Sequence, residues 1–185
     1  MDINFFTDYF EMIKQGIKSV DNSLLEKAAE RIKKVSSAGK KIIIAGNGGS
    51  AAMASHVSVD FTKVARIRAI NFNEADLLTC FANDYGYENV FEKAIDFYGD
   101  DNDLVILISS SGNSANVINA ANHAKKLNIG VITFTGFESN NALRKLGDIN
   151  FWVDSKAYNI VEMTHHIWLL AIVDFIFGKT TYKAS

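Results

Sequence analysis

The chain has 185 residues, of which 48% are hydrophobic and 22% are charged, and its net charge is -2 with a pI near 6.1. These values are typical of one globular domain, so we expect a single domain over residues 1–185, and the lack of a basic block argues against nucleic acid as a partner. The one cysteine, Cys80, excludes an internal disulfide and suits a reducing compartment, which predicts a cytoplasmic protein.

Two helices are predicted before the first strand. The segment MDINFFTDYF has no basic region, so we expect no secretory signal. A helix over residues 3–20 is amphipathic, and its apolar stripe consists of Phe6, Tyr9, Phe10, Ile13, Ile17 and Val20. A second helix, capped by Asn22 or Ser23, extends to about Ala38. We interpret residues 1–38 as an N-terminal helical hairpin that is used in oligomer packing.

Short apolar strands then alternate with helices. In chain order, the pattern predicts a strand at 41–45, a helix at 50–63, a strand at 68–72, helices at 74–82 and 88–97 around a turn, a strand at 103–109, a helix at 114–127, a strand at 130–136, a short helix at 140–146, a strand at 149–153 and a helix at 159–177. Such alternation indicates a parallel sheet with helices on both faces. We therefore predict an α/β fold, a doubly wound three-layer sandwich with a five-stranded parallel sheet.

The C-terminal helix is apolar on nearly all sides after residue 166. Its longest apolar run, residues 167–177, includes Asp174 and is shorter than the roughly 18 residues that span a bilayer, so we expect no membrane partner. A helix of this kind is buried, and a small chain has little interior left for it. We therefore expect a homo-oligomer, with the alternative that both terminal helices only cover the sheet of their own chain.

Two strand-to-helix junctions are rich in small polar residues, AGNGGSAA at 45–52 and SSSGNSAN at 109–116. Glycines let the backbone approach a ligand, helix N-termini offer free N–H groups, and serine hydroxyls add donors. In an open α/β sheet, such loops lie at the carboxyl ends of the strands, where ligands bind. The predicted phosphate ligands are Ser109, Ser110, Ser111 and Ser114, and the adjoining part of the same molecule would contact Asn47, Gly48 and Ser50.

Two other interpretations of these loops remain. Ser50 and Ser114 are good helix N-caps and need have no further role. Residues 46–51 also fit the dinucleotide pattern G-x-G-x-x-A, but that pattern requires an acidic residue at the end of the second strand, where Asn73 stands. The dinucleotide interpretation leaves the serine loop unexplained, so phosphate binding is the favoured hypothesis.

The segments GNGGSAAMASH, CFANDYGY and SSSGNSANVINAA together resemble the sugar isomerase (SIS) family, and within it the phosphoheptose isomerases. The resemblance spans nearly the whole chain. It implies a tetramer assembled through the terminal helices and a serine loop that binds the sugar phosphate. It also implies interconversion of sedoheptulose 7-phosphate and a glycero-manno-heptose 7-phosphate, for surface polysaccharide synthesis. On this basis Asp84 is a candidate for contacting sugar hydroxyls.

An aldose–ketose isomerisation of this kind can proceed through an enediol, with one base and one acid and without a nucleotide or redox cofactor. His56 and Asp60 are four residues apart on one helix and share a face, either as a catalytic pair or as a surface pair. The family has a glutamate in place of Asp60, and in some members it binds zinc together with the histidine. A zinc ion is therefore possible here, though not required, with His56, Asp60 and His165 as its candidate ligands.

The C-terminal helix departs from the family pattern, which places a glutamine directly before a glutamate and a catalytic histidine eight residues after the glutamine. Anchored on Glu162, these positions hold Val161 and Leu169, which neither transfer protons nor bind metal. The helix offers EMTHHIW instead. Glu162 and His165 therefore join the predicted catalytic set, although buried histidines often only pack, and His166 has no assigned role.

These departures keep open a second hypothesis from another functional class. The chain would then be a non-catalytic SIS protein that senses a phosphosugar or binds a partner, as one branch of the family binds the bacterial replication initiator protein. The retained His56 and the acid at position 60 favour the enzyme.

Overall fold

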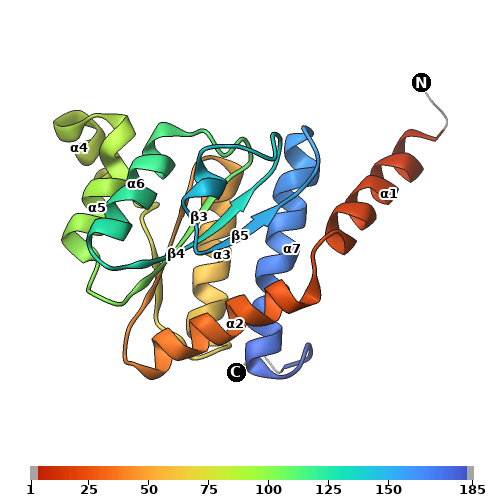
Figure 1. Cartoon of the computed structure of the whole chain (residues 1–185), viewed down its shortest axis with the longest axis horizontal. Coiled ribbons are helices and arrows are strands. Elements are labelled where there is room, and N and C mark those ends of the chain that lie inside the picture. Colours follow the sequence, from red (N-terminus) through yellow and green to blue (C-terminus); the bar gives the residue numbers. More distant parts are fainter. Residues whose placement is uncertain (1–3, 183–185) are drawn as a thin grey trace.

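The computed structural model describes residues 4–182 (Figure 1). Its elements in chain order are α1 (Phe5–Lys18), α2 (Asn22–Ser37), β1 (Ile42–Gly46), α3 (Gly49–Lys63), β2 (Ala69–Asn71), α4 (Ala75–Tyr85), the 3-10 turn η1 (Tyr87–Asn89), α5 (Val90–Tyr98), β3 (Leu104–Ser109), α6 (Ala115–Lys126), β4 (Gly130–Thr135), the 3-10 turn η2 (Leu143–Lys145), β5 (Ile149–Trp152) and α7 (Tyr158–Phe177). The predicted strands and long helices are therefore present. Residue 3, where the sequence predicts the first helix to begin, lies outside the described residues.

Some boundaries differ from the prediction for local chemical reasons. The N-cap of α2 is Asp21, not Asn22 or Ser23, because the Asp21 carboxylate accepts a hydrogen bond from the Ser23 N–H at 2.9 Å. Helix α4 continues to Tyr85 through part of the predicted turn and ends at Gly86, which has a φ of 83°. The short helix expected near 140–146 is the single 3-10 turn η2.

The five strands form one parallel sheet, as predicted, and their order is β2-β1-β3-β4-β5. The chain adds β2 on one side of β1 and then returns to place β3 on the other side. The sheet therefore has a topological switch point between β1 and β3, where the two polar loops follow their strands. Ligand sites of open α/β sheets lie at such points.

Helices cover both faces of the sheet, which gives three layers. One core forms where α2, α3 and α7 pack on the strands, and it includes Ile32, Phe61 and Trp168. The other core forms beneath α5 and α6, with α4 at its margin, and includes Phe91 and Val117. Every residue of β1, β3 and β4 is buried, as expected for strands covered on both sides.

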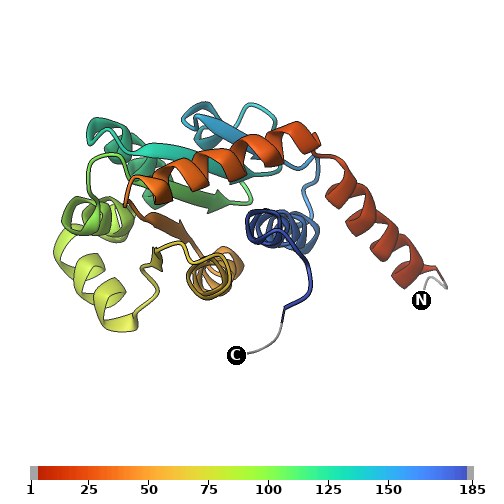
Figure 2. The ribbon, with the colours of Figure 1, turned by 90° about the horizontal axis from the view of Figure 1, so that it is seen from below.

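The two N-terminal helices lie at an angle to each other. Figures 1 and 2 show α2 lying across the sheet layer and α1 projecting away from it, and both helices contact α7. Large apolar side chains remain exposed on these elements: Phe6 and Phe10 of α1 are 72% and 65% exposed, and Phe175 of α7 is 52% exposed.

Helix α7 is long and apolar enough to cross a membrane by length and composition alone. In the structure it lies beside the sheet, contacts α1, α2 and α3, and buries Trp168, Leu169 and Ile172. A core helix with these contacts accounts for its apolar composition.

Candidate active site

The two polar loops meet at the switch point and enclose a cavity of about 220 Å³, which we call the serine pocket. Its lining residues are Asn47, Ser50, Ile108, Ser109, Ser110, Ser111, Ser114, Tyr158 and Glu162. The structure therefore brings together all four predicted phosphate-binding serines with Asn47, Ser50 and Glu162. These residues come from the ends of β1 and β3 and the beginnings of α3 and α7.

The serine loop presents hydroxyl groups with few internal partners. The Oγ atoms of Ser109 and Ser114 lie 3.1 Å apart, and the Ser111 hydroxyl accepts a weak hydrogen bond from the Asn113 N–H at 3.2 Å. The Ser110 hydroxyl is buried and has no hydrogen-bond partner of good geometry among residues 4–182. The Glu162 carboxyl lies near this hydroxyl, and a ligand oxygen in the pocket would complete its hydrogen bonding.

The helix-cap interpretation of these serines is wrong. Ser114 occupies the N-cap position of α6, but its side chain makes no capping hydrogen bond. The N-cap of α3 is Gly48, and Ser50 lies inside that helix. The first N–H groups of α6 are therefore not satisfied by a serine cap, and they adjoin the serine pocket as expected for an anion site.

Packing beneath the loop fixes its backbone. Gly112 has a φ of 66°, and a side chain there would collide with the amide of Asn141. The Asn141 Nδ2 donates to the carbonyl oxygens of Glu138 at 2.9 Å and Gly136 at 3.2 Å, while the Gly136 N–H donates to the Ser110 carbonyl at 2.9 Å. The hydroxyls therefore stand on a rigid turn.

Asn47 links the glycine loop to α6. Its side-chain amide and that of Asn116 exchange two hydrogen bonds, each 2.9 Å long, and the Tyr87 hydroxyl donates to the Asn47 Oδ1 at 2.9 Å. These contacts use both lone pairs of that oxygen and leave one N–H of Asn47 free to donate.

Glu162 is the ionisable group on the wall of the serine pocket. Its carboxylate lies directly against Gly49, the first residue of α3, because any side chain at that glycine would overlap the carboxylate. Burial raises the pKa of Glu162, and the nearby Ser110 hydroxyl partly opposes this rise. A carboxyl group with a raised pKa is suited to exchanging protons near neutral pH.

A second polar group extends from α3 to α7. The His56 Nε2 lies 3.4 Å from the Asp60 Oδ2, and the His56 Nδ1 lies 3.0 Å from the His166 Nε2, so one imidazole donates a hydrogen bond to the other. Burial lowers the pKa of His166, the nearby His56 lowers it further, and Asp60 opposes the change. The structure thus confirms that His56 and Asp60 share a face, and it identifies His166 as their partner on α7.

His165 lies elsewhere, and its predicted role needs correction. Its ring is fully buried against Phe134 and Trp168, its Nε2–H donates to the Thr135 carbonyl at 2.9 Å, and its Nδ1 has no partner among the described residues. Burial lowers the pKa of His165 to about 4, so the ring is neutral at pH 7. This imidazole packs in the core and faces away from His56.

The predicted zinc ligands are consequently not assembled. His56 and Asp60 are in contact, but His165 does not join them, and within residues 4–182 no three His, Cys, Asp or Glu side chains are arranged to hold a metal ion. The donor set of this chain therefore does not fit the predicted zinc site.

The structure also places Asp84 outside the serine pocket. Asp84 is exposed on α4, where its carboxylate accepts hydrogen bonds from Asn83 and Cys80. Another residue of the same segment, Tyr87, reaches the glycine loop instead.

Sequence reasoning missed Tyr158, Asn116 and Tyr87 at this site. Tyr158 stands four residues before Glu162 at the start of α7, so the i,i+4 spacing is a signal that identifies it. Asn116 and Tyr87 offered no comparable signal, because they contact the loop through the tertiary fold.

Comparison with known proteins agrees with the fold. Residues 5–136 match the model of the SIS domain, and the chain belongs to the SIS domain family. Its relatives within that family are phosphoheptose isomerases. The one from Fusobacterium nucleatum is 33% identical over 93% of this chain and 91% of its own length, and the one from Thermodesulfovibrio yellowstonii is 38% identical over 89% and 87%.

Solved structures give the same result. The phosphoheptose isomerase of Neisseria gonorrhoeae aligns with a TM-score of 0.86 at 30% identity, covering 94% of this chain and 96% of that chain. That of Francisella tularensis aligns with a TM-score of 0.87 at 25% identity, covering 95% and 98%. The SIS fold is thereby confirmed over nearly the full chain.

Proposed function

We propose that this protein is an aldose–ketose isomerase that interconverts sedoheptulose 7-phosphate and a glycero-manno-heptose 7-phosphate. The observation that supports this most directly is the serine pocket, where four serine hydroxyls, the Glu162 carboxyl and an uncapped helix N-terminus face one cavity. The similarity to phosphoheptose isomerases over most of the chain supports the choice of substrate.

The phosphate of the substrate would bind in the serine pocket. Ser109, Ser110, Ser111 and Ser114 offer hydroxyl donors, and the first turn of α6 offers N–H groups and the positive end of its dipole. Asn47 and Ser50 would contact the adjoining hydroxyls of the sugar. Binding the phosphate at one fixed end orients the rest of a flexible chain for reaction.

The acid–base groups would be Glu162 and the hydrogen-bonded set of His56, Asp60 and His166. A base removes the proton from the carbon next to the carbonyl, an enediol forms, and a proton returns to the neighbouring carbon. Glu162 has the raised pKa and borders the serine pocket, so it is our candidate for this transfer. His166 lies one helical turn along α7 from Glu162, a rise of about 6 Å, and its hydrogen bond to His56 would let the two histidines exchange protons with the substrate oxygens. No metal is part of this proposal.

We also propose that the protein is a cytoplasmic homotetramer and that it supplies heptose for surface polysaccharide. Exposed Phe6 and Phe10 on α1 and exposed Phe175 on α7 support subunit packing through the terminal helices. Replacing Phe6 and Phe10 by glutamate should reduce the mass measured by light scattering. An unchanged mass would refute assembly through α1.

The function is tested by incubating the purified protein with sedoheptulose 7-phosphate and following the aldose product by NMR. Glu162→Gln should lower turnover by roughly 100-fold or more while phosphosugar binding persists. Ser110→Ala should weaken binding by roughly tenfold, and Ser139→Ala, an exposed serine outside the pocket, should change neither quantity.

The same measurements separate the enzyme from a phosphosugar sensor. Retained binding of sedoheptulose 7-phosphate with no turnover by the parent protein would reject the isomerase and support the sensor. Asp60→Asn tests the histidine pair, because the loss of the carboxylate beside His56 should slow turnover. Unchanged turnover would reject a role for Asp60.

A further inference from the structure

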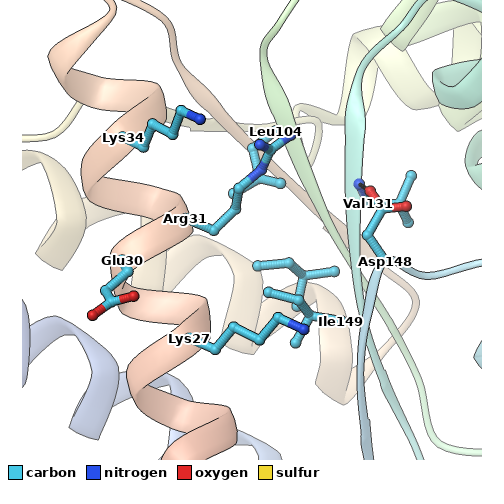
Figure 3. Close-up of a pocket in the computed structure, with 9 residues that line it drawn as sticks. Lys27, Glu30, Arg31, Lys34, Leu104, Val131, Asp148 and Ile149 are labelled. Carbon is cyan, nitrogen blue, oxygen red and sulfur yellow. Dashed lines mark hydrogen bonds between the residues drawn. The ribbon is translucent and has the colours of Figure 1, made fainter.

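A second cavity, of about 460 Å³, lies between α2 and the sheet, and we call it the basic groove (Figure 3). Its lining residues are Lys27, Glu30, Arg31 and Lys34 of α2 and Leu104, Val131, Ile132, Asp148 and Ile149 at the beginnings of β3, β4 and β5. The groove therefore lies at the amino ends of the strands, whereas the serine pocket lies at their carboxyl ends. Strand β4 has six residues and therefore five steps of about 3.3 Å, which separate the two edges of the sheet by roughly 16 Å.

Three cations line one side of the basic groove. Lys27, Arg31 and Lys34 are four and three residues apart, so they lie on one face of α2. Figure 3 shows their side chains directed toward the strands and the carboxylate of Glu30 directed away from them. None of the three cations forms an ion pair with any residue between 4 and 182. Their position on one helix face gives the groove a local positive charge in a chain whose net charge is -2.

The carboxylate on the opposite side is already engaged. The Asp148 Oδ2 accepts a hydrogen bond from the Val131 N–H at 2.9 Å, which holds it against β4. Arg31 lies against the backbone at Gly130, where an added Cβ would be 2.9 Å from its Nη2. The glycine thus makes room for the guanidinium at the edge of the sheet, and packing rather than an ion pair holds it there.

The spacing of the cations indicates the shape of an anion. Seven residues separate Lys27 from Lys34, so their positions span about 10 Å along the helix, with Arg31 between them. One phosphate group is too small to contact all three side chains. A diphosphate is longer, the lining keeps a net positive charge after Glu30 and Asp148 are counted, and the fork of Arg31 suits two of the diphosphate oxygens. The apolar residues on the floor of the groove, such as Val131 and Ile149, are buried, so a ligand would contact the charged ends of the Lys27, Arg31 and Lys34 side chains.

We propose that the basic groove binds a diphosphate group, either inorganic pyrophosphate or the diphosphate of a nucleotide. Arg31 would bind its centre, and Lys27 and Lys34 would bind its two ends. This site is independent of the serine pocket and of the proposed isomerase function.

The test is isothermal titration of the full-length protein with inorganic pyrophosphate, uridine diphosphate and inorganic phosphate. Pyrophosphate should bind at least roughly tenfold more tightly than phosphate, and added salt should weaken binding. Equal affinity for pyrophosphate and uridine diphosphate would identify the diphosphate alone as the ligand, whereas tighter binding of uridine diphosphate would identify a nucleotide; both support the proposal.

Variants locate the binding. Arg31→Met keeps the alkyl stem and should weaken pyrophosphate binding by roughly tenfold or more, and Arg31→Lys should restore part of it. The matched control is Lys33→Gln on the same helix, whose amino group lies over the Phe175 ring, 5.2 Å from its centroid, and it should have no effect. Binding that survives Arg31→Met but is lost in Ser110→Ala would place the anion in the serine pocket and overturn the proposal. Absence of pyrophosphate binding at about 1 mM would also overturn it.

Discussion

The buried His165 predicts that the fold loses stability as the pH falls below 6.5. The folded protein holds this imidazole neutral with a pKa of about 4, whereas the unfolded chain has the ordinary value of 6.5. As the pH falls below 6.5, the unfolded chain therefore binds a proton that the folded chain excludes. The contribution of His165 to the free energy of unfolding therefore decreases through this window, and it changes no further below pH 4.

The size of the effect follows from the two pKa values. The interval from 6.5 to about 4, at about 1.4 kcal/mol for each pH unit, corresponds to a loss of about 3 kcal/mol. This is a large part of the stability of a typical domain. The cause is structural: the ring is fully buried, and only its Nε2–H has a partner, the Thr135 carbonyl.

The assay is urea unfolding at a series of pH values, followed by tryptophan fluorescence, because the ring centroid of Trp168 lies 6.1 Å from that of His165. His165→Gln keeps a donor for Thr135 and removes the titration, so its stability should vary much less between pH 6.5 and 4. The control is Ser139→Ala, an exposed position without an ionisable side chain, which should keep the parent slope. A His165→Gln variant with the parent slope would refute the reasoning.

Further predictions concern the sheet and the site. Asp103 is fully buried and ion-paired with Lys41, so Asp103→Ala should lower the free energy of unfolding by about 3 kcal/mol in urea titrations; a loss below about 1 kcal/mol would contradict this. Gly49→Ala should displace the Glu162 carboxylate and lower kcat more than it changes phosphosugar affinity, and equal effects on both would argue against it. Asn116→Ala should raise KM for sedoheptulose 7-phosphate several-fold by freeing the glycine loop, and an unchanged KM would count against that role.

The fold was largely predictable from the sequence because its strands are continuous apolar runs. Residues 103–109 and 130–136 each predict a strand, and both are buried on the two faces of the sheet. Helix ends were less predictable, since they depend on single residues. Asp21 caps α2 from just outside the apolar pattern, and Gly86 ends α4 inside the segment that suggested a turn.

The serine pocket was also predictable, because most of its residues lie in two short segments that directly follow predicted strands. A parallel sheet forces two loops that follow neighbouring strands to meet, so Asn47 and Ser110 could be placed together before the structure was known. Which histidine faces His56 could not be predicted. His165 and His166 point about 100° apart on α7, and that helix is apolar on nearly every side, so periodicity does not separate its core face from its site face.

The positions where the chain departs from the family pattern explain why His165 is in the core and His166 faces His56. Val161, His165 and Leu169 are spaced by four residues, and all three are fully buried in the core that α7 shares with the sheet. Glu162 and His166 have the same spacing one residue later, on the stripe that faces α3. Apolar residues at 161 and 169 make the first stripe a packing surface, and a histidine within that stripe becomes a neutral core residue. The acid–base groups that we propose, Glu162 and His166, are therefore on the neighbouring stripe, about 100° around the helix.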